Sequence, residues 1–265
     1  MFEEYDVIVV GAGHAGCEAA VSAAKMGSKV MLVTMNMQTI AQMSCNPAMG
    51  GVAKGQIVRE IDAMGGYSGI VSDRSMIQFR MLNKSKGPAV WSPRTQNDRM
   101  LFAQVWRNML EETNNIDFFQ DMVKSLIIKN GKAVGVITGI GVEIKAKAVV
   151  LTNGTFLNGL IHIGEKQFGG GRIGEKAATG ITEQLIDLGF ESGRMKTGTP
   201  PRIDGRSLNY DRMEIQHGDE DIVGFSFKET EKPKTQKPCY ITHTSTEVHN
   251  ILKTGFEKSP MFAGR

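Results

Sequence analysis

The chain has 265 residues, 41% of them hydrophobic and 22% charged, and its formal net charge is +3. This balance excludes wholesale disorder, which requires low hydrophobicity and high net charge, and the 31 glycines cluster without the three-residue period of collagen. No apolar run reaches the ~18 residues of a membrane-spanning helix, and the start of the chain lacks the basic segment of a signal peptide. We therefore expect a cytoplasmic protein without a membrane partner.

The chain opens with the pattern of a βαβ half-unit. Residues 5–10 (YDVIVV) are apolar and β-branched, which predicts a buried parallel strand. An Ala-rich stretch over 17–26 predicts a helix that Gly27 ends. Residues 29–34 (KVMLVT) predict a second strand.

The next sixty residues lack clear periodicity. We predict a loop-rich insertion over 35–94, interrupted by one helix at about 57–64, and loops of this length inside a domain are usually functional. A helix follows over 96–112, with one apolar face made by Leu101, Phe102, Val105, Met109 and Leu110.

From residue 116 the pattern turns to strands. Residues 122–128 and 133–137 flank Asn130-Gly131, which predicts a hairpin within a β meander over 116–147. Further strands are predicted at 142–147 and at 148–152, the second one buried and returning to the first sheet. Beyond these we predict a helix over 177–188, an exposed charged loop over 228–237 and a strand over 238–243.

The loop between the first strand and the first helix carries the pattern Gly11-x-Gly13-x-x-Gly16. Its position between a buried strand and a helix is typical of a dinucleotide-binding fingerprint. Gly11 would permit the tight turn, Gly13 the close approach of a pyrophosphate, and Gly16 the packing of helix on strand. The alternative is a plain strand–turn–helix that needs small residues for packing alone.

An acidic residue that binds a ribose hydroxyl is expected about twenty residues further on. None is present there, so Thr34 or Asn36 would have to make that contact more weakly. The long insertion, the meander and the return strand favour a flavin over a nicotinamide, because their layout resembles the FAD-binding domain of glutathione-reductase-like flavoproteins. That resemblance implies a backbone contact to adenine at Val123 and places Gly154 near the ADP portion.

The three cysteines, Cys17, Cys45 and Cys239, include no C-x-x-C pair, so we expect neither a disulfide framework nor a metal site. Cys17 falls inside the first predicted helix and is interpreted as packing. Cys45 lies in a polar turn, where Lys54 and Arg59 would favour its thiolate. By position alone it is either a buried apolar cysteine or a nucleophile or redox partner beside a flavin.

Longer motifs add a more specific resemblance. They are QMSCNPAMGG at 42–51, KGQIVREIDAMGG at 54–66, QFRMLNKSKGPAV at 78–90, AKAVVLTNGTFLNG at 146–159, GRMKTGTPPRID at 193–204 and PCYITHT at 238–244. Together with the glycine loop they resemble the GidA (MnmG) family of flavoproteins that modify the wobble uridine of tRNA, across essentially the whole chain.

The resemblance implies an FAD enzyme that works with a GTPase partner, MnmE, and is a homodimer at full length. The pair adds an aminomethyl or carboxymethylaminomethyl group to carbon 5 of the wobble uridine of tRNA, with methylene-tetrahydrofolate as the one-carbon donor and NADH as the reductant. Cys45 would be one of two functional cysteines and attack the uridine ring. The pyrophosphate of FAD would be held by Gly11, Ala12, Gly13, His14, Ala15 and Gly16.

The implied fold is α/β: an FAD/NAD(P)-binding Rossmann-like domain of glutathione-reductase-like type, with an antiparallel β meander and an inserted α+β region. It would occupy residues 1–200, and residues 201–265 would begin an inserted second domain. Family members are more than twice as long, so the resemblance implies an N-terminal fragment. We expect this fragment to bind FAD weakly or not at all, and not to modify tRNA alone.

Two alternatives stay open at this point. One is another FAD-dependent enzyme of the folate-dependent tRNA uridine methyltransferase type, which shares the glycine loop. The other is a non-catalytic FAD- or tRNA-binding module. Basic residues that could contact tRNA, or be ordinary solvated charges, are Lys84, Lys86, Arg94, Arg99, Arg194 and Arg202.

Overall fold

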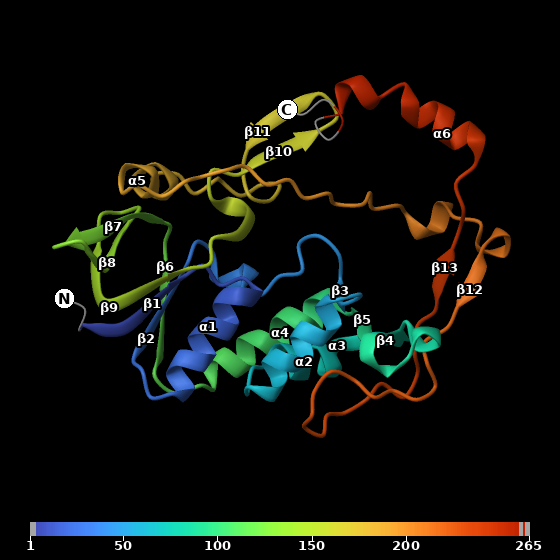
Figure 1. The fold of residues 1–265 in the computed structure, drawn as a ribbon, viewed down its shortest axis with the longest axis horizontal. Coiled ribbons are helices and arrows are strands. Elements are labelled where there is room, and N and C mark those ends of the chain that lie inside the picture. Colours follow the sequence, from blue (N-terminus) through green and yellow to red (C-terminus); the bar gives the residue numbers. More distant parts are fainter. Residues whose placement is uncertain (1–3, 260–261, 263–265) are drawn as a thin grey trace.

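The fold contains a six-stranded sheet, on the left in Figure 1, in a computed structural model that describes residues 4–259 and 262. The first three residues, on which part of the signal-peptide expectation depends, lie outside the described residues, as do 260, 261 and 263–265 of the predicted second domain. The strand order is β6-β2-β1-β9-β8-β7. The strands are β1 (Tyr5–Val10), β2 (Val30–Thr34), β6 (Ile116–Gln120), β7 (Val123–Lys129), β8 (Lys132–Thr138) and β9 (Glu143–Leu151).

Strand β1 lies in the middle of the parallel part of this sheet. It pairs with β2 on one side and with β9 on the other, and β2 pairs in turn with β6, all in parallel. The carboxyl ends of β1, β2 and β9 therefore meet at one edge of the sheet. In open α/β sheets this edge is where ligands bind.

Two helices cover one face of the parallel strands. They are α1 (His14–Lys25) and α4 (Arg99–Glu111), and they bury Cys17 and Val21 with Phe102 and Trp106. The predicted apolar face of α4 is partly wrong. Leu101 is 44% exposed, whereas Trp106 is fully buried, because the helix is rotated so that positions 102, 106 and 110 face the core that α4 shares with α1.

The meander β7-β8-β9 is antiparallel and joins the parallel strands through β9. With α5 (Ile181–Asp187) it forms a second core, in which Ile181 packs with side chains from β1 and β2. The prediction of two strands over 142–152 is wrong, because β9 runs unbroken from Glu143 to Leu151. Its second half is also less buried than predicted, since Val150 is 37% exposed.

The region predicted to be loop-rich with a single helix has more regular structure than its pattern indicates. It contains an antiparallel sheet in the order β3-β5-β4 and two helices. Their bounds are β3 (Ala48–Gly50), β4 (Met76–Leu82), β5 (Ser92–Asn97), α2 (Lys54–Ala63) and α3 (Ser68–Ser75). The predicted helix at about 57–64 corresponds to α2, whereas hydropathy missed the three strands and α3 because β5 and α3 bury polar side chains. Thr95 and Asn97 are hydrogen-bonded to each other at 2.7 Å, and Asn97 donates to the Ser72 carbonyl oxygen at 2.8 Å.

The second half of the chain extends around this body (Figure 1). The hairpin β10 (Leu160–Ile163) and β11 (Lys166–Gly169) precedes α5, and an exposed segment over 190–203 without helix or strand follows it. The chain then forms the antiparallel pair β12 (Glu214–Gln216) and β13 (Cys239–Ile241), which α6 (Thr246–Lys253) follows.

The segment between β12 and β13 is anchored on the first half of the chain. Asp73 is buried at the end of α3 and accepts hydrogen bonds from the backbone amides of Phe225 and Ser226, at 2.8 and 3.0 Å. It also forms an ion pair with Lys232 at 3.2 Å. The predicted exposed loop over 228–237 is therefore held against the body at Lys232. Among the described residues, no helix is long and apolar enough to cross a bilayer.

Candidate functional site

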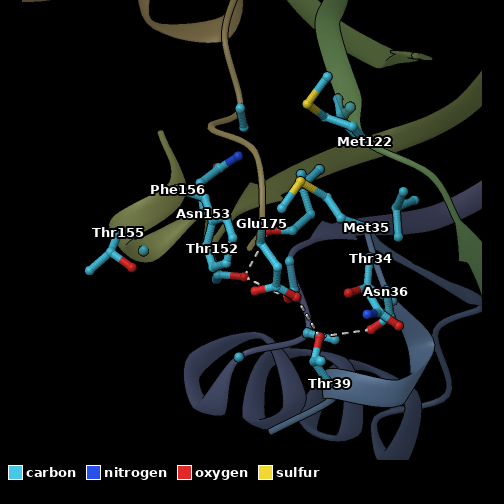
Figure 2. Close-up of a pocket in the computed structure, with 18 of the residues that line it drawn as sticks. Thr34, Met35, Asn36, Thr39, Met122, Thr152, Asn153, Thr155, Phe156 and Glu175 are labelled. Carbon is cyan, nitrogen blue, oxygen red and sulfur yellow. Dashed lines mark hydrogen bonds between the residues drawn. The ribbon is translucent and has the colours of Figure 1, made fainter. Parts of the chain in front are cut away.

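A cavity of about 190 Å³ opens at the carboxyl ends of β1, β2 and β9 (Figure 2). Six of the predicted cofactor-binding residues line it together: Gly11, Ala12, Gly13, Thr34, Val123 and Gly154. These residues are far apart in the sequence, and the parallel pairing of β1 with β2 and β9 brings the ends of these strands to one edge of the sheet. His14, Ala15, Gly16 and Cys45 do not line the cavity.

The three glycines of the loop have three different surroundings. Gly11 has φ +102°, and a Cβ there would come within 2.7 Å of the Thr152 carbonyl oxygen. A Cβ at Gly16 would overlap the carbonyl oxygen of Gly11, so Gly16 lets α1 cross β1 closely. A Cβ at Gly13 would meet no described atom within 4 Å, although this residue lines the cavity. Gly11 and Gly16 thus serve the fold, and Gly13 leaves room for a ligand.

The N-terminus of α1 faces this cavity without a cap. Gly13 is the N-cap residue, no side chain of the described residues caps it, and the first turn contains no acidic residue. The free N–H groups and the positive end of the helix dipole therefore favour an anion such as a phosphate. Ala12, which precedes the N-cap, is buried, and Ala15 is exposed on the first turn.

The His14 side chain turns away from the cavity. Its Nε2 lies 3.1 Å from the Ala41 carbonyl oxygen, and its ring packs 5.0 Å from that of Phe102. Burial lowers the pKa of His14, although the hydrogen bond with Ala41 opposes this shift. The imidazole is thus a packing group that ties the first turn of α1 to the segment after β2.

The end of β2 supplies two polar residues to the cavity, Thr34 and Asn36. The Asn36 side chain already accepts a hydrogen bond from the Gln38 amide at 2.9 Å. On the same side, the Asp121 amide donates to the Thr34 carbonyl oxygen at 2.9 Å, and the buried Val123, which begins β7, lines the cavity two residues further on. Gly154 has φ +56° and lies where β9 has ended, with open space around its Cβ position.

The cavity also contains side chains that the sequence patterns did not single out. Arg172 and Glu175 come from the loop before α5 and form an ion pair at 2.7 Å. Arg172 reaches across to the side chains of Gln42 and Thr39. Asn153 Oδ1 is buried and has no hydrogen-bond partner among the described residues. No local pattern could have found this loop, because it reaches the cavity only through the tertiary fold.

Cys45 is exposed, so the interpretation as a buried apolar cysteine is wrong for this residue. The Cys45 Sγ lies 3.6 Å from the Gly198 carbonyl oxygen, and the Arg202 guanidinium donates a hydrogen bond to the Cys45 carbonyl oxygen. The preceding residue, Ser44, lines the cavity. The thiol therefore lies at the border of the cavity, beside the segment 190–203.

The other two cysteines differ from Cys45. Cys17 is fully buried in α1, and burial raises the pKa of its thiol, so it is a packing residue as the sequence predicts. Cys239 contacts the Gln78 carboxamide at 3.3 Å. Arg59, expected near the Cys45 thiolate, donates instead to the Gly224 carbonyl oxygen and stacks on Phe227.

Among the six basic residues suggested for tRNA contact, Lys84, Arg194 and Arg202 bind other groups of the chain, and Arg202 lies beside the Cys45 loop. Lys84 forms an ion pair with Asp219 at 2.8 Å, and Arg194 donates to the Asn158 carbonyl oxygen. Arg94 and Arg99 are half-buried, while Lys86 is exposed. Arg202 is the member of this set that contacts the Cys45 loop.

The residues at this cavity fit one half of a dinucleotide cofactor. The uncapped helix N-terminus and the open space over Gly13 suit a pyrophosphate, and the buried Asn153 Oδ1 offers an acceptor without a partner. Sites for whole drug-sized ligands measure roughly 300–1,000 Å³. A cavity of about 190 Å³ therefore suits the adenosine diphosphate half better than the whole of FAD.

Comparison with known proteins places the chain in one family. The model of the family described as glucose inhibited division protein A matches residues 6–265. The chain is 72% identical over 266 residues to the tRNA uridine 5-carboxymethylaminomethyl modification enzyme MnmG of Cytophaga hutchinsonii, covering 100% of this chain and 43% of that protein. The protein of the same name from Flavobacterium johnsoniae is 71% identical, with 99% and 42% covered. The chain thus spans less than half the length of these curated relatives.

Solved structures agree with this assignment. GidA of Aquifex aeolicus in its form I crystal superposes with a TM-score of 0.94 at 44% identity, covering 98% of this chain and 44% of that one. The GidA-related protein from Thermus thermophilus has a TM-score of 0.53 at 23% identity, with 71% and 70% covered, and this likeness shows the fold alone. The predicted FAD-binding Rossmann-like α/β fold with its antiparallel strands is confirmed. The chain therefore belongs to the glucose inhibited division protein A (GidA) family.

Proposed function

We propose that this chain is the FAD-binding part of an enzyme that adds a carboxymethylaminomethyl group to carbon 5 of the wobble uridine of tRNA. The observation that carries this proposal is the 72% identity, over the whole of this chain, to a relative named for that modification. The cavity supports it, because its helix N-terminus and its glycine cradle suit the pyrophosphate of FAD. Bound FAD would supply two-electron redox chemistry at this site.

The same proposal includes the reductant, the one-carbon donor, the protein partner, the oligomeric state and the cellular compartment. The reductant is NADH, the one-carbon donor is methylene-tetrahydrofolate, and the partner is the GTPase MnmE. The full-length enzyme is a cytoplasmic homodimer whose substrate is tRNA. A tRNA substrate suits the exposed edge of the cavity at Cys45, where Arg202 and the exposed Lys196 offer positive charge beside the Cys45 thiol.

Cys45 is the nucleophile in this proposal. A thiol that attacks a uridine ring must be reachable by the base, and Cys45 is exposed while its neighbour Ser44 lines the cofactor cavity. The backbone around it is fixed, because the Pro47 carbonyl oxygen accepts from the Asn97 amide at 2.7 Å and Arg202 holds the Cys45 carbonyl. The thiol is therefore presented by an anchored loop, which favours a defined angle of attack.

A chimaera tests the function directly. This chain replaces the matching 43% of the Cytophaga hutchinsonii relative, and tRNA nucleosides are measured by mass spectrometry in a strain that lacks its own enzyme. We expect the chimaera to restore the modified uridine and to retain FAD. Cys45→Ala should abolish the modification with FAD retained, whereas Gly13→Ala should lower the FAD content because a methyl group fills the cradle.

Cys239→Ala is the matched control, because this cysteine contacts Gln78 rather than the cavity, and the modification should persist. A folded chimaera that leaves tRNA unmodified, while the parent relative modifies it, would refute the proposed function. Modification that persists in Cys45→Ala would refute the nucleophile alone.

A further inference from the structure

The cofactor cavity lacks an acid at the usual ribose position. Dinucleotide-binding folds commonly place a carboxylate at the end of the second strand, where it accepts hydrogen bonds from ribose hydroxyls. Here β2 ends at Thr34, which is 9% exposed, and the following Asn36 uses its side-chain oxygen to cap the short helix at Met37–Thr39. Neither residue offers a carboxylate.

Asp121, a second acid at the cavity wall, is already committed to the backbone. It accepts from the amides of Met122 and Ile140, at 2.7 and 3.0 Å. Burial alone would raise the pKa of Asp121, but these hydrogen bonds and one from Thr138 hold the pKa below its ordinary value. Its carboxylate therefore fixes the turn between β8 and β9.

Glu175 has acceptor capacity left over. Its Oε2 is buried within 2.7 Å of Arg172 Nε, while Oε1 receives, from the part of the chain that the structure describes, only a long contact of 3.4 Å from the Thr39 hydroxyl. A carboxylate can accept about four hydrogen bonds. Figure 2 shows the Glu175 carboxylate pointing to the side of the cavity where Thr39 and Asn36 lie. This is the side on which the end of β2 would otherwise present its acid.

Arg172 fixes the position of that carboxylate. Its guanidinium packs 5.0 Å from the Phe156 ring and donates to Gln42 Oε1 and the Thr39 hydroxyl. Its donors are thus directed to Glu175, Gln42 and Thr39. An arginine that recognises a 2′-phosphate needs free donors, so the pair suits unphosphorylated ribose hydroxyls.

We propose that Glu175, positioned by Arg172, accepts hydrogen bonds from the ribose hydroxyls of the adenosine half of the cofactor. This inference rests on the proposed cofactor site and adds which nucleotides that site accepts. A loop about 140 residues beyond β2 supplies the acid that the end of β2 lacks. The cavity therefore selects a nucleotide with free 2′- and 3′-hydroxyls and rejects one with a phosphate there, because that phosphate would meet the Glu175 carboxylate.

Ligand analogues combined with protein variants test this contact. The chimaera described above, which carries this chain within a full-length relative, is titrated with FAD, and ADP, 2′-deoxy-ADP and 3′-deoxy-ADP then compete with the bound flavin. We expect at least one deoxy analogue to bind about tenfold or more weakly than ADP, since a hydrogen bond to a charged group is lost. In Glu175→Gln, ADP should weaken and this discrimination should shrink to less than about threefold.

Glu165→Gln is the matched control, because this glutamate is 66% exposed, pairs with Lys258 and does not line the cavity. Glu165→Gln should discriminate between ADP and its deoxy analogues as strongly as the protein without this substitution. If the chimaera without further substitutions binds ADP and both deoxy analogues equally, the inference is overturned without any variant having to fold. If Glu175→Gln keeps the full discrimination, it is also overturned while the cofactor site stands. A folded chimaera that binds neither FAD nor ADP, while the parent relative binds both, would refute the proposed cofactor site itself.

Discussion

At the scale of single residues, one motif divides into different physical roles. Gly16 is required by the fold, because any side chain there would overlap the backbone of Gly11. Gly13 is free of such contacts, because no described atom lies within 4 Å of its Cβ position. The fingerprint predicts a tight turn at Gly11, the close approach of a pyrophosphate at Gly13 and packing of helix on strand at Gly16, and the surroundings of Gly11 and Gly16 agree with their two roles.

The two glycines should therefore respond differently to alanine. Gly16→Ala forces helix and strand apart, and we expect a loss of about 3 kcal/mol in the free energy of unfolding. Gly13→Ala should change the free energy of unfolding by less than about 1 kcal/mol. Urea unfolding followed by circular dichroism measures both. Equal destabilisation by the two substitutions would contradict the division of roles.

At the scale of elements, buried polar contacts join segments that are distant in the chain. Asp73 at the end of α3 binds two backbone amides, the Thr230 hydroxyl and the Lys232 ammonium group. Beside it, the fully buried Phe225 packs where a Cβ on Gly50 would lie. The segment after β12 is thus attached to the sheet that carries the Cys45 loop.

Removing the Asp73 carboxylate should release that segment. Asp73→Ala leaves two amides and a cation without their acceptor, and we expect a loss of about 3 kcal/mol or more. Hydrogen exchange should accelerate at the Phe225 and Ser226 amides. Lys84→Ala is the control, because its ion pair with Asp219 is half exposed and should cost less than about 1 kcal/mol. Unchanged exchange in Asp73→Ala would show that other contacts hold the segment.

At the scale of the whole molecule, the body and the last part of the chain are joined by an exposed connection. Residues 190–203 contain no helix or strand and include the basic residues Arg194, Lys196 and Arg202. The same connection passes the Cys45 thiol at Gly198. A substrate that reaches Cys45 must therefore contact or displace this segment.

Limited digestion with trypsin should cut this connection first, because exposed backbone without regular hydrogen bonds is cleaved most readily. We expect cleavage after Arg194, Lys196 or Arg202, and not after Arg172, which is held in its ion pair. The two pieces should elute together in gel filtration, because the Asp73 contacts bridge them. Separation of the pieces under native conditions would contradict this arrangement.

The sequence by itself determined the first βαβ unit, most of the meander and the family. The predicted meander over 116–147 is wrong at its start, because residues 116–120 form β6, which pairs in parallel with β2. These features are local or nearly so: β-branched runs predict β1 and β2, Asn130-Gly131 predicts the β7–β8 turn, and the glycine loop predicts the start of α1. Hydropathy failed between residues 35 and 97, because β5 and α3 bury polar side chains whose partners lie in other elements.

Only the tertiary structure decided which residues share the cavity. Thr34, Val123 and Gly154 become neighbours because β2, β7 and β9 belong to one sheet. Glu175 reaches the same cavity from a loop without a recognisable pattern, and the exposure of Cys45 depends on the course of the segment around Gly198. A local pattern records the conformation of its own residues, whereas a site of this kind consists of contacts between residues more than a hundred positions apart.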